Sequence, residues 1–342
     1  MTKHQHVGID VSATELVVSI SGIAAVENNL IFSNTPSGYQ QLIKRLTKQN
    51  RTASVGLEST GVYSQPVALA LHGIKALTVH VLNPRAVKDF ARASMARAKT
   101  DKQDASLIRE YILRMDVEPW EPPRQAVREL QALSRRIHQL KEEVRREDNR
   151  HKQSLIQGYT VVADDILINL QHLKARQAQL EQACLDLIEA DDLLAGQHRL
   201  LHSIIGIGDR AAPALLAELA TLPAGMKGKQ WVAHAGLDPR PRESGSSLNK
   251  PRRITKTGNR YLRHALYMPA LVAIRHSEHV RGFYEHLIAQ GKKPKQAIVA
   301  VMRKLLLCIH GILKHGRRFE GSRFYRLPMP DAEKAEKLAA SA

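Results

Sequence analysis

The chain is 342 residues long, and its 51 Lys and Arg residues against 33 Asp and Glu give it a net charge of +18. A hydrophobic content of 43% is enough to build folded cores and excludes a mainly disordered chain, and the length predicts two or three domains. An aromatic content of only 4% argues against an RNA binder that works mainly by base stacking, while the positive charge makes nucleic acid the expected partner.

The cysteines and the apolar runs predict a cytoplasmic protein. Cys184 and Cys308 are far apart and flanked by apolar residues, which predicts reduced core thiols and excludes a Cys-based zinc site. Residues 1–8 lack the apolar core of a signal peptide. The longest apolar candidate, 297–313, contains two cations and a histidine, so we expect no membrane span.

The first hundred residues alternate strand and helix patterns. Short apolar runs predict strands over His6–Asp10, Glu15–Ser21, Asn29–Ser33, Ser54–Glu58 and Ala76–Leu82. Helical periodicity predicts helices over Tyr39–Gln49 and Pro66–His72. This order indicates an α/β domain with a mixed sheet over residues 1–118.

Four carboxylates in this domain stand where metal chemistry would need them. Asp10 ends the first predicted strand and Glu58 the fourth, so adjacent strands would bring both to one edge of the sheet. Asp101 and Asp104 follow a capping-box residue, Thr100, and would share one face of a helix. Taken singly, such acids are commonly turn residues or partners of the helix dipole. Together they predict a site for a pair of Mg²⁺ ions of the kind used in phosphoryl transfer.

A helical hairpin is predicted over residues 119–198. Three prolines in Asp116–Arg124 end the first domain. Apolar residues then recur at spacings of three and four in two stretches, on either side of a break at Gly158 and Tyr159. This pattern predicts an antiparallel pair of helices with coiled-coil-like seams, which could serve as a scaffold, in dimerisation, or to reach along a nucleic acid.

The last section, 199–326, is predicted to be mainly helical and is strongly basic, with a tail at 327–342. Residues 225–326 contain 22 Lys and Arg against 5 Asp and Glu, which predicts a phosphate-binding surface. The segment Ile204–Gly208 resembles the turn of a helix–hairpin–helix that contacts a DNA backbone, although a plain helix connection fits nearly as well.

A second chemical centre is predicted inside the basic section. In the run RESGSS, Ser244 precedes a glycine and lies among cations. Such a pair is commonly a flexible loop, but a serine surrounded by Arg and Lys could attack a phosphate, and Ser246 and Ser247 are rival nucleophiles. The predicted nucleic-acid contacts are Arg242, Arg252, Arg253, Lys256, Arg260 and Arg263.

These motifs, in this order, resemble the insertion sequence 110 family of DEDD transposases, which is related to Piv-type DNA invertases and includes bridge-RNA-guided recombinases. The resemblance is based on Asp10 in GIDVS, Glu58 in GLESTGVY, Asp101 and Asp104 in KTDKQDA, the GIGDRAAPALLAEL segment, and AHAGLDPRPRESGSS followed by RRITKTGNRYLRHALY. It spans nearly the whole chain.

The resemblance implies a fold, a mechanism and partners. It implies an RNase H-like (RuvC-like) first domain whose four acids bind Mg²⁺, and a C-terminal transposase domain in which Ser244 is the catalytic serine. That serine would attack a DNA phosphodiester and form a transient phosphoserine link. The resemblance also implies dimers that pair into tetramers through the coiled coil, with acids and serine from different subunits in one site. A structured bridge RNA would pair with donor and target DNA.

Three other functions remain open at this point. A purely hydrolytic, RuvC-like nuclease or junction resolvase would need the acids but no serine. A DNA invertase could use the same motifs without an RNA guide. A packaging protein for DNA or RNA would explain the charge but not the four acids.

Overall fold

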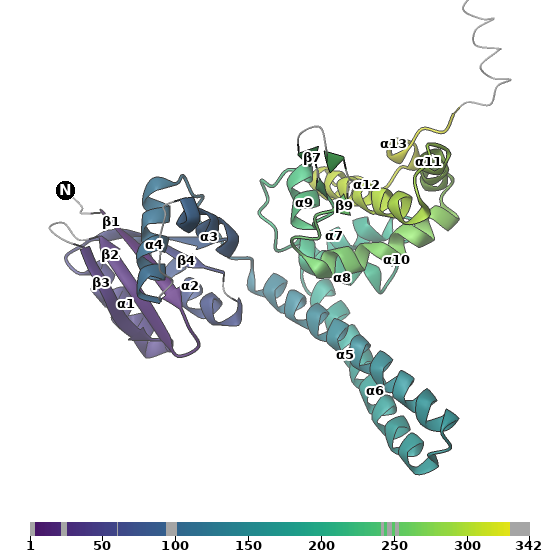
Figure 1. The fold of residues 1–342 in the computed structure, drawn as a ribbon, viewed down its shortest axis with the longest axis horizontal. Helices are drawn as coiled ribbons and strands as arrows, with labels where there is room; N and C mark the ends of the chain where they lie inside the picture. Colours follow the sequence, from purple (N-terminus) through teal and green to yellow (C-terminus); the bar gives the residue numbers. More distant parts are fainter. Residues whose placement is uncertain are drawn as a thin grey trace, which may run out of the picture. The chain divides into compact units, whose positions relative to one another are not determined.

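A computed structural model describes residues 4–21, 26–59, 61–93, 101–240, 243–244, 248–249 and 253–328, with backbone alone for 101–103, 243–244 and 248–249. The chain forms two compact units, Met1–Pro122 and Pro123–Ala342 (Figure 1). The boundary falls within the proline-rich segment that is predicted to end the first domain. The finer division of the second unit at residue 198 stays a prediction.

The first unit is a five-stranded mixed sheet with helices packed on it, which confirms the predicted α/β class and is compatible with an RNase H-like fold. Its strands are β1 (His4–Val11), β2 (Glu15–Ser21), β3 (Val26–Ser33), β4 (Thr52–Glu58) and β5 (Leu77–Leu82), in the order β3-β2-β1-β4-β5. Strand β1 pairs antiparallel with β2 and parallel with β4, and β4 pairs parallel with β5. Its helices are α1 (Pro36–Thr47), α2 (Ser64–His72), α3 (Pro84–Ala93) and α4 (Asp101–Arg114), with a short 3₁₀ turn, η1 (Gly61–Tyr63).

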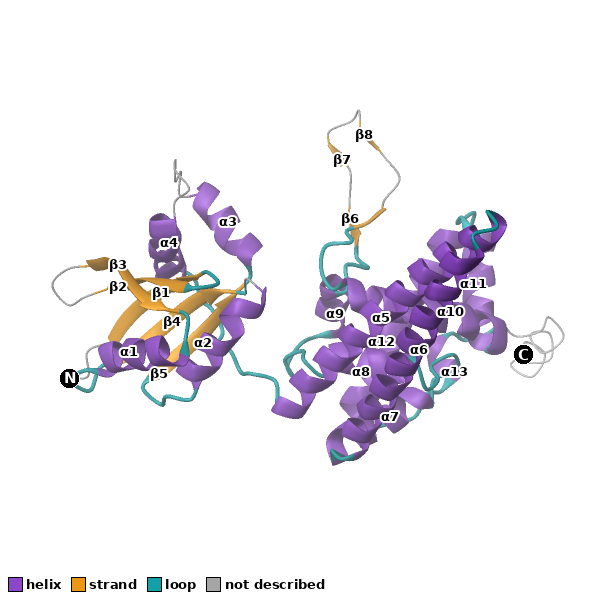
Figure 2. Cartoon of the chain, turned by 90° about the horizontal axis from the view of Figure 1, so that it is seen from below, coloured by secondary structure: helices purple, strands orange, loops and turns teal. Residues whose placement is uncertain are grey.

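Different helices cover the two faces of the sheet, and successive residues of each strand face them alternately. Val7, Ile9, Val55 and Leu57 are fully buried in one cluster with the apolar residues of α1 and α2. Gly8 and Gly56 point to the other face, where α4 packs (Figure 2). Residues at the carboxyl ends of β1 and β4 therefore also alternate between the face covered by α1 and α2 and the face covered by α4.

The first helix differs from its predicted range. It begins at Pro36, where the Thr35 side chain accepts a hydrogen bond from the Gly38 amide, and it ends at Thr47. Gln49 and Asn50, with φ of 62° and 54°, take the left-handed conformation, which ends helical periodicity before the predicted limit.

The second unit starts with two long helices, α5 (Gln125–Ile156) and α6 (Thr160–Glu189), which pack against each other. Among the apolar residues that recur at spacings of three and four, Leu130, Ile137, Leu140, Leu170 and Cys184 are buried. Coiled-coil geometry as such stays a prediction. The rest of the second unit, residues 192–328, is called the helical lobe below. The base of the hairpin belongs to the core of this lobe, because Leu130 and Cys184 lie in one cluster with the buried residues of the later helices.

The helical lobe forms around a central helix, α12. Its helices are α7 (Asp192–His202), α8 (Ala211–Leu219), α9 (Gly228–His234), α10 (Arg260–His276), α11 (Glu278–Ala289), α12 (Pro294–His315) and α13 (Gly321–Phe324), and its strands are β6 (Pro239–Arg240), β7 (Glu243–Ser244), β8 (Leu248–Asn249) and β9 (Arg253–Ile254). Within the described ranges, α12 is the one helix long and apolar enough to cross a membrane. Its Val301, Leu305 and Ile309 are fully buried among the other helices, as expected of a core helix.

Candidate functional site

The acids predicted on the first and fourth strands lie at equivalent positions of neighbouring strands. The parallel pairing of β1 with β4 runs to Ile9 opposite Leu57. Asp10 and Glu58 are the next residues of these strands and are both partly exposed. The two carboxylates therefore stand at the same carboxyl edge of the sheet, and each lies two residues after a glycine that faces α4.

Helix α4 packs on β1 at a separation that only glycine allows. A Cβ built on Gly8 would lie 2.0 Å from the carbonyl oxygen of Ala105 and 2.4 Å from the backbone nitrogen of Arg109. Asp10 points to the same face as Gly8, because side chains alternate along a strand. Asp104, which is partly buried, directly precedes Ala105. The close approach therefore carries Asp104 to the strand that bears Asp10.

The packing of α4 also decides which way its acidic face turns. Ile108, one turn after Asp104, is fully buried with Leu82 at the end of β5 and with Val87 of α3. The face shared by Asp104 and Ile108 is thus turned to the carboxyl edge of the sheet. Asp101 lies three residues before Asp104 on the same helix, and only its backbone is described.

The donor chemistry of these residues fits Mg²⁺. Carboxylate oxygens are the ligands that this ion prefers, and neither a thiol nor an imidazole belongs to the set. Among the side chains that the structure describes, which leave out that of Asp101, no three His, Cys, Asp or Glu residues are grouped as a metal site. Asp10, Glu58 and Asp104 thus share an edge without forming a ready-made three-ligand cluster.

Arg109 is a buried cation that the sequence analysis missed. Its side chain is 8% exposed, and Nη2 donates to Oε1 of Glu110 at 2.9 Å. Its Nε and Nη1 are buried without a hydrogen-bond partner among the described residues. The spacing Ala105, Ile108, Arg109, Ile112 marks the buried face of α4, so helical periodicity could have shown that this arginine faces inward.

Ser244 lies on a β-ribbon that consists of two short antiparallel strand pairs, β6 with β9 and β7 with β8. At its foot, β6 pairs with β9 through Pro239 opposite Ile254 and Arg240 opposite Arg253. Further out, β7 pairs with β8, with Ser244 opposite Leu248. Figure 2 shows β7 and β8 beyond β6, on the side of the lobe where α9 lies. Ser246, Ser247, Arg242 and Arg252 lie outside the described residues, and the side chain of Ser244 is not described.

Hydrogen bonds join the residues that follow β9 to the residues between α9 and β6. The Thr255 amide donates to the Asp238 carbonyl at 2.9 Å, and its hydroxyl donates to the Asp238 carboxylate at 2.7 Å. The Lys256 amide donates to the Gly236 carbonyl at 3.1 Å. Lys256 takes a φ of 54°, an unusual conformation for a non-glycine residue that these bonds hold in place.

The described members of the predicted nucleic-acid set lie along this segment. Arg253, Lys256 and Arg260 are exposed. Arg263 is partly buried, donates from Nη1 to the Ala235 carbonyl at 2.9 Å, and has a pKa lowered by desolvation. It therefore links α10 to the residue that follows α9.

The glycine-rich turn between α7 and α8 has a packing role. Gly206 has a φ of 99°, and a Cβ there would lie 2.6 Å from the Pro269 carbonyl oxygen of α10. Ile204 and Ile207 on either side are buried. Close contact with α10 is thus enough to explain this glycine, and a helix–hairpin–helix contact with DNA stays a prediction.

Comparison with known proteins decides the family. Residues 7–160 match a transposase family model, the DEDD transposase of IS110, and residues 198–285 match the transposase IS116/IS110/IS902 family. The pilin gene-inverting protein of Moraxella bovis is 30% identical over 300 residues, which cover 85% of this chain and 90% of that protein. The chain belongs to the IS110 transposase family. An uncharacterised IS110 protein of Streptomyces coelicolor is 25% identical over 160 residues, or 47% of this chain.

Membership of the IS110 family settles the class of activity. The chain is a DNA-cutting and rejoining enzyme, which removes the packaging alternative. The two matched ranges of this IS110-family transposase contain the sheet-edge acids and the serine ribbon respectively.

Proposed function

We propose that this IS110-family transposase is a site-specific recombinase that uses two chemical centres, the carboxylates Asp10, Glu58, Asp101 and Asp104 and the hydroxyl of Ser244. The observation that carries the proposal is the placement of Asp10 and Glu58 at one register of adjacent strands, with the acidic face of α4 turned to the same edge. Its place of action would be the cytoplasm, on nucleoid DNA.

The proposed reaction exchanges DNA strands without net hydrolysis. The Ser244 hydroxyl gives up its proton as its oxygen bonds to a DNA phosphorus, the ester bond to the leaving strand breaks, and the leaving oxygen takes up a proton. A hydroxyl end of the partner strand then gives up its proton as it attacks the phosphoserine, and the serine oxygen leaves and takes up a proton. Mg²⁺ held by the carboxylates would activate the attacking oxygen and stabilise the leaving one. The exposed cations Arg253, Lys256 and Arg260 would hold the DNA or RNA backbone.

A covalent protein–DNA adduct tests this proposal. Wild-type protein with Mg²⁺, DNA carrying its own element ends and any RNA transcribed from the element should form an adduct that survives denaturation. Ser244→Ala should abolish the adduct, and Asp10→Ala should abolish recombination. An adduct formed by Ser244→Ala would overturn the serine assignment, with Ser246→Ala and Ser247→Ala as matched controls. Full cleavage without any adduct would favour the RuvC-like hydrolytic nuclease.

A homo-oligomer, dimers pairing to a tetramer, belongs to the proposal. The tip of the α5–α6 hairpin carries a dense set of exposed apolar side chains, including Ile156 at 86%, Val161 at 82% and Ile168 at 69% exposure. Such a patch is typical of a protein–protein contact. Ile156→Ser combined with Val161→Ser should lower the oligomeric state in sedimentation. An unchanged state would remove the tip from the interface.

Inversion without an RNA guide is the second candidate, and a bridge RNA is the first. The pilin gene-inverting proteins of Moraxella bovis and Moraxella lacunata, each 30% identical over 85% of this chain, favour the second. Recombination assays with and without the element's own transcript separate the two. Activity that survives ribonuclease treatment would support the unguided invertase.

A further inference from the structure

One carboxylate is deeply buried in the helical lobe, and the reaction proposed above does not use it. Glu218 of α8 is 1% exposed in a helix whose other residues are nearly all apolar. An ionised group is expensive to bury unless it is paired and hydrogen-bonded. The surroundings of Glu218 therefore decide what it does.

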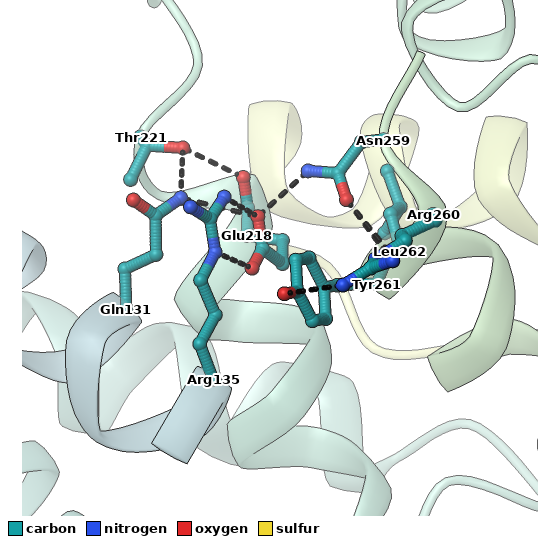
Figure 3. A network of polar contacts seen from close by, with 8 residues as sticks. All are labelled: Gln131, Arg135, Glu218, Thr221, Asn259, Arg260, Tyr261 and Leu262. Carbon is teal, nitrogen blue, oxygen red and sulfur yellow. Dashed lines mark hydrogen bonds and ion pairs between the residues drawn. The ribbon is translucent and has the colours of Figure 1, made fainter. Parts of the chain in front are cut away.

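Side chains from two other parts of the unit, α5 and the residue before α10, converge on Glu218 (Figure 3). Arg135 of α5 donates from Nε to Oε1 at 2.9 Å and from Nη2 to Oε2 at 3.0 Å. Gln131, one turn earlier on α5, donates to Oε2 at 3.1 Å. Asn259 donates from Nδ2 to the same Oε2 at 2.6 Å. Burial opposes ionisation of Glu218, but the hydrogen bonds from Arg135 and Asn259 outweigh it and lower its pKa.

Asn259 connects this carboxylate to the start of α10 and to the end of α9. Its Oδ1 accepts from the amides of Tyr261 and Leu262 at 2.9 and 3.0 Å and so caps α10. Since Oδ1 is committed to the cap, Nδ2 is the end that faces Glu218. The Asn259 amide donates to the His234 carbonyl at 2.8 Å, at the end of α9. One residue therefore joins the start of α10, the end of α9 and the buried carboxylate.

The same junction reaches the hairpin arm through Tyr261. The Arg135 guanidinium lies 4.9 Å from the Tyr261 ring centroid, and Arg260 lies 5.0 Å from it. Arg135 thus contacts both the carboxylate and the first turn of α10. Movement of α5 relative to α10 would have to break charged hydrogen bonds to a buried group, which are among the stronger ones in proteins.

We propose that Glu218 is a positioning residue for the strand-exchange reaction, holding the Arg253–Arg263 segment, and with it the foot of the Ser244 ribbon, in register with α9 and α5. This inference rests on the proposed function only for its activity readout. Its structural part, that Glu218 orders the segment through Asn259, is testable by itself.

Glu218→Gln is the informative variant because it keeps the size of the side chain and removes one acceptor. The amide nitrogen would then face N–H donors. Glu218→Asp keeps the charge and should restore part of the function. Ser277→Ala is the matched control, since it removes the buried cap of α11, which accepts from the Val280 amide, without touching the network.

The experiment has two readouts. Hydrogen exchange of the amides in 253–263 should be faster in Glu218→Gln than in wild type and unchanged in Ser277→Ala. The rate of adduct formation at saturating DNA should fall by about tenfold or more in Glu218→Gln, as expected for a displaced reacting group, while the dissociation constant for DNA changes by less than about threefold. Glu218→Asp should recover part of the rate.

Several results would overturn the inference. Unchanged exchange in Glu218→Gln refutes it whatever the activity, and faster exchange with a wild-type rate refutes it equally. If Glu218→Gln does not fold, Asn259→Ser, which keeps a capping hydroxyl and loses the donor to Glu218, takes its place under the same criteria. A wild-type protein that forms no adduct defeats the proposed function, and the exchange measurement then decides the inference alone.

Discussion

Replacing Gly8 by alanine tests whether the packing of α4 on β1 positions the acids. The added Cβ would lie 2.0 Å from the Ala105 carbonyl oxygen and 2.4 Å from the Arg109 amide nitrogen, where an ordinary contact needs 3.4 Å or more. Both neighbours are backbone atoms, so relief requires that α4 as a whole move away from β1 by about 1 Å or more. We expect a loss of about 1–3 kcal/mol of unfolding free energy from overpacking. The same shift would separate Asp104 from Asp10 and lower the strand-exchange rate by about a hundredfold.

Two further glycines make this a graded series. At Gly56 the added Cβ would meet side-chain methyls of Ile112 and Ile108 at 2.8 and 3.1 Å, which can rotate, so Gly56→Ala should be milder. At Gly73 the nearest atom would be 3.7 Å away, an ordinary contact, and Gly73→Ala should be neutral. Urea unfolding and DNA cleavage by folded protein measure the two effects separately. Wild-type stability and activity in Gly8→Ala would refute the close packing of α4 on β1 and its role in positioning Asp104.

Three other predictions concern charge and protonation. Arg253→Ala should weaken DNA binding at all sequences and reduce the slope of log K against log salt by about one, and an unchanged slope would remove Arg253 from the interface. Burial raises the pKa of the Cys184 and Cys308 thiols to about 11. Both thiols should therefore react slowly with iodoacetamide near neutral pH in the folded protein and much faster in urea. Rapid alkylation of the folded protein would contradict this burial. Because the folded pKa of Glu218 is depressed, its ionised form stabilises the protein fully above an unfolded pKa of about 4.3, and this contribution is lost as pH falls through the lower folded pKa. The gap in unfolding free energy between wild type and Glu218→Gln should therefore shrink on acidification, and a constant gap would refute the shift.

The sequence predicted the sheet because its pattern is local. Short apolar runs identify β1, β2 and β4 within a few residues of their ends. The acids at the ends of the first and fourth predicted strands lie at one edge because β1 and β4 are neighbours in the sheet. The basic section and the serine motif could also be located from charge and composition.

Other features depend on contacts between distant segments and could not be predicted in this way. In the sequence, Gly8 looks like an ordinary strand glycine. The need for glycine there comes from its contact with Ala105 of α4, which lies 97 residues later in the chain. Glu218 is a single acid in the apolar run AAPALLAEL, and nothing local indicates that its partners come from α5 and from the start of α10. Long-range pairing of polar groups has no period in the sequence, so periodicity cannot reveal it.

The two proposed chemical centres differ in what holds them, and this explains why a buried carboxylate would matter. The acids are carried by a five-stranded sheet and by a helix packed against it without space for a Cβ, so the core of the first unit determines their positions. Ser244 is carried by paired strands of two residues each, which offer few ladder hydrogen bonds of their own. The orientation of such a ribbon is set mainly where it leaves the lobe. The segment that continues from β9 is joined to α9 and α10 by Asn259, and Asn259 is linked to α5 through Glu218. The accuracy that strand exchange requires of the serine would depend on this attachment.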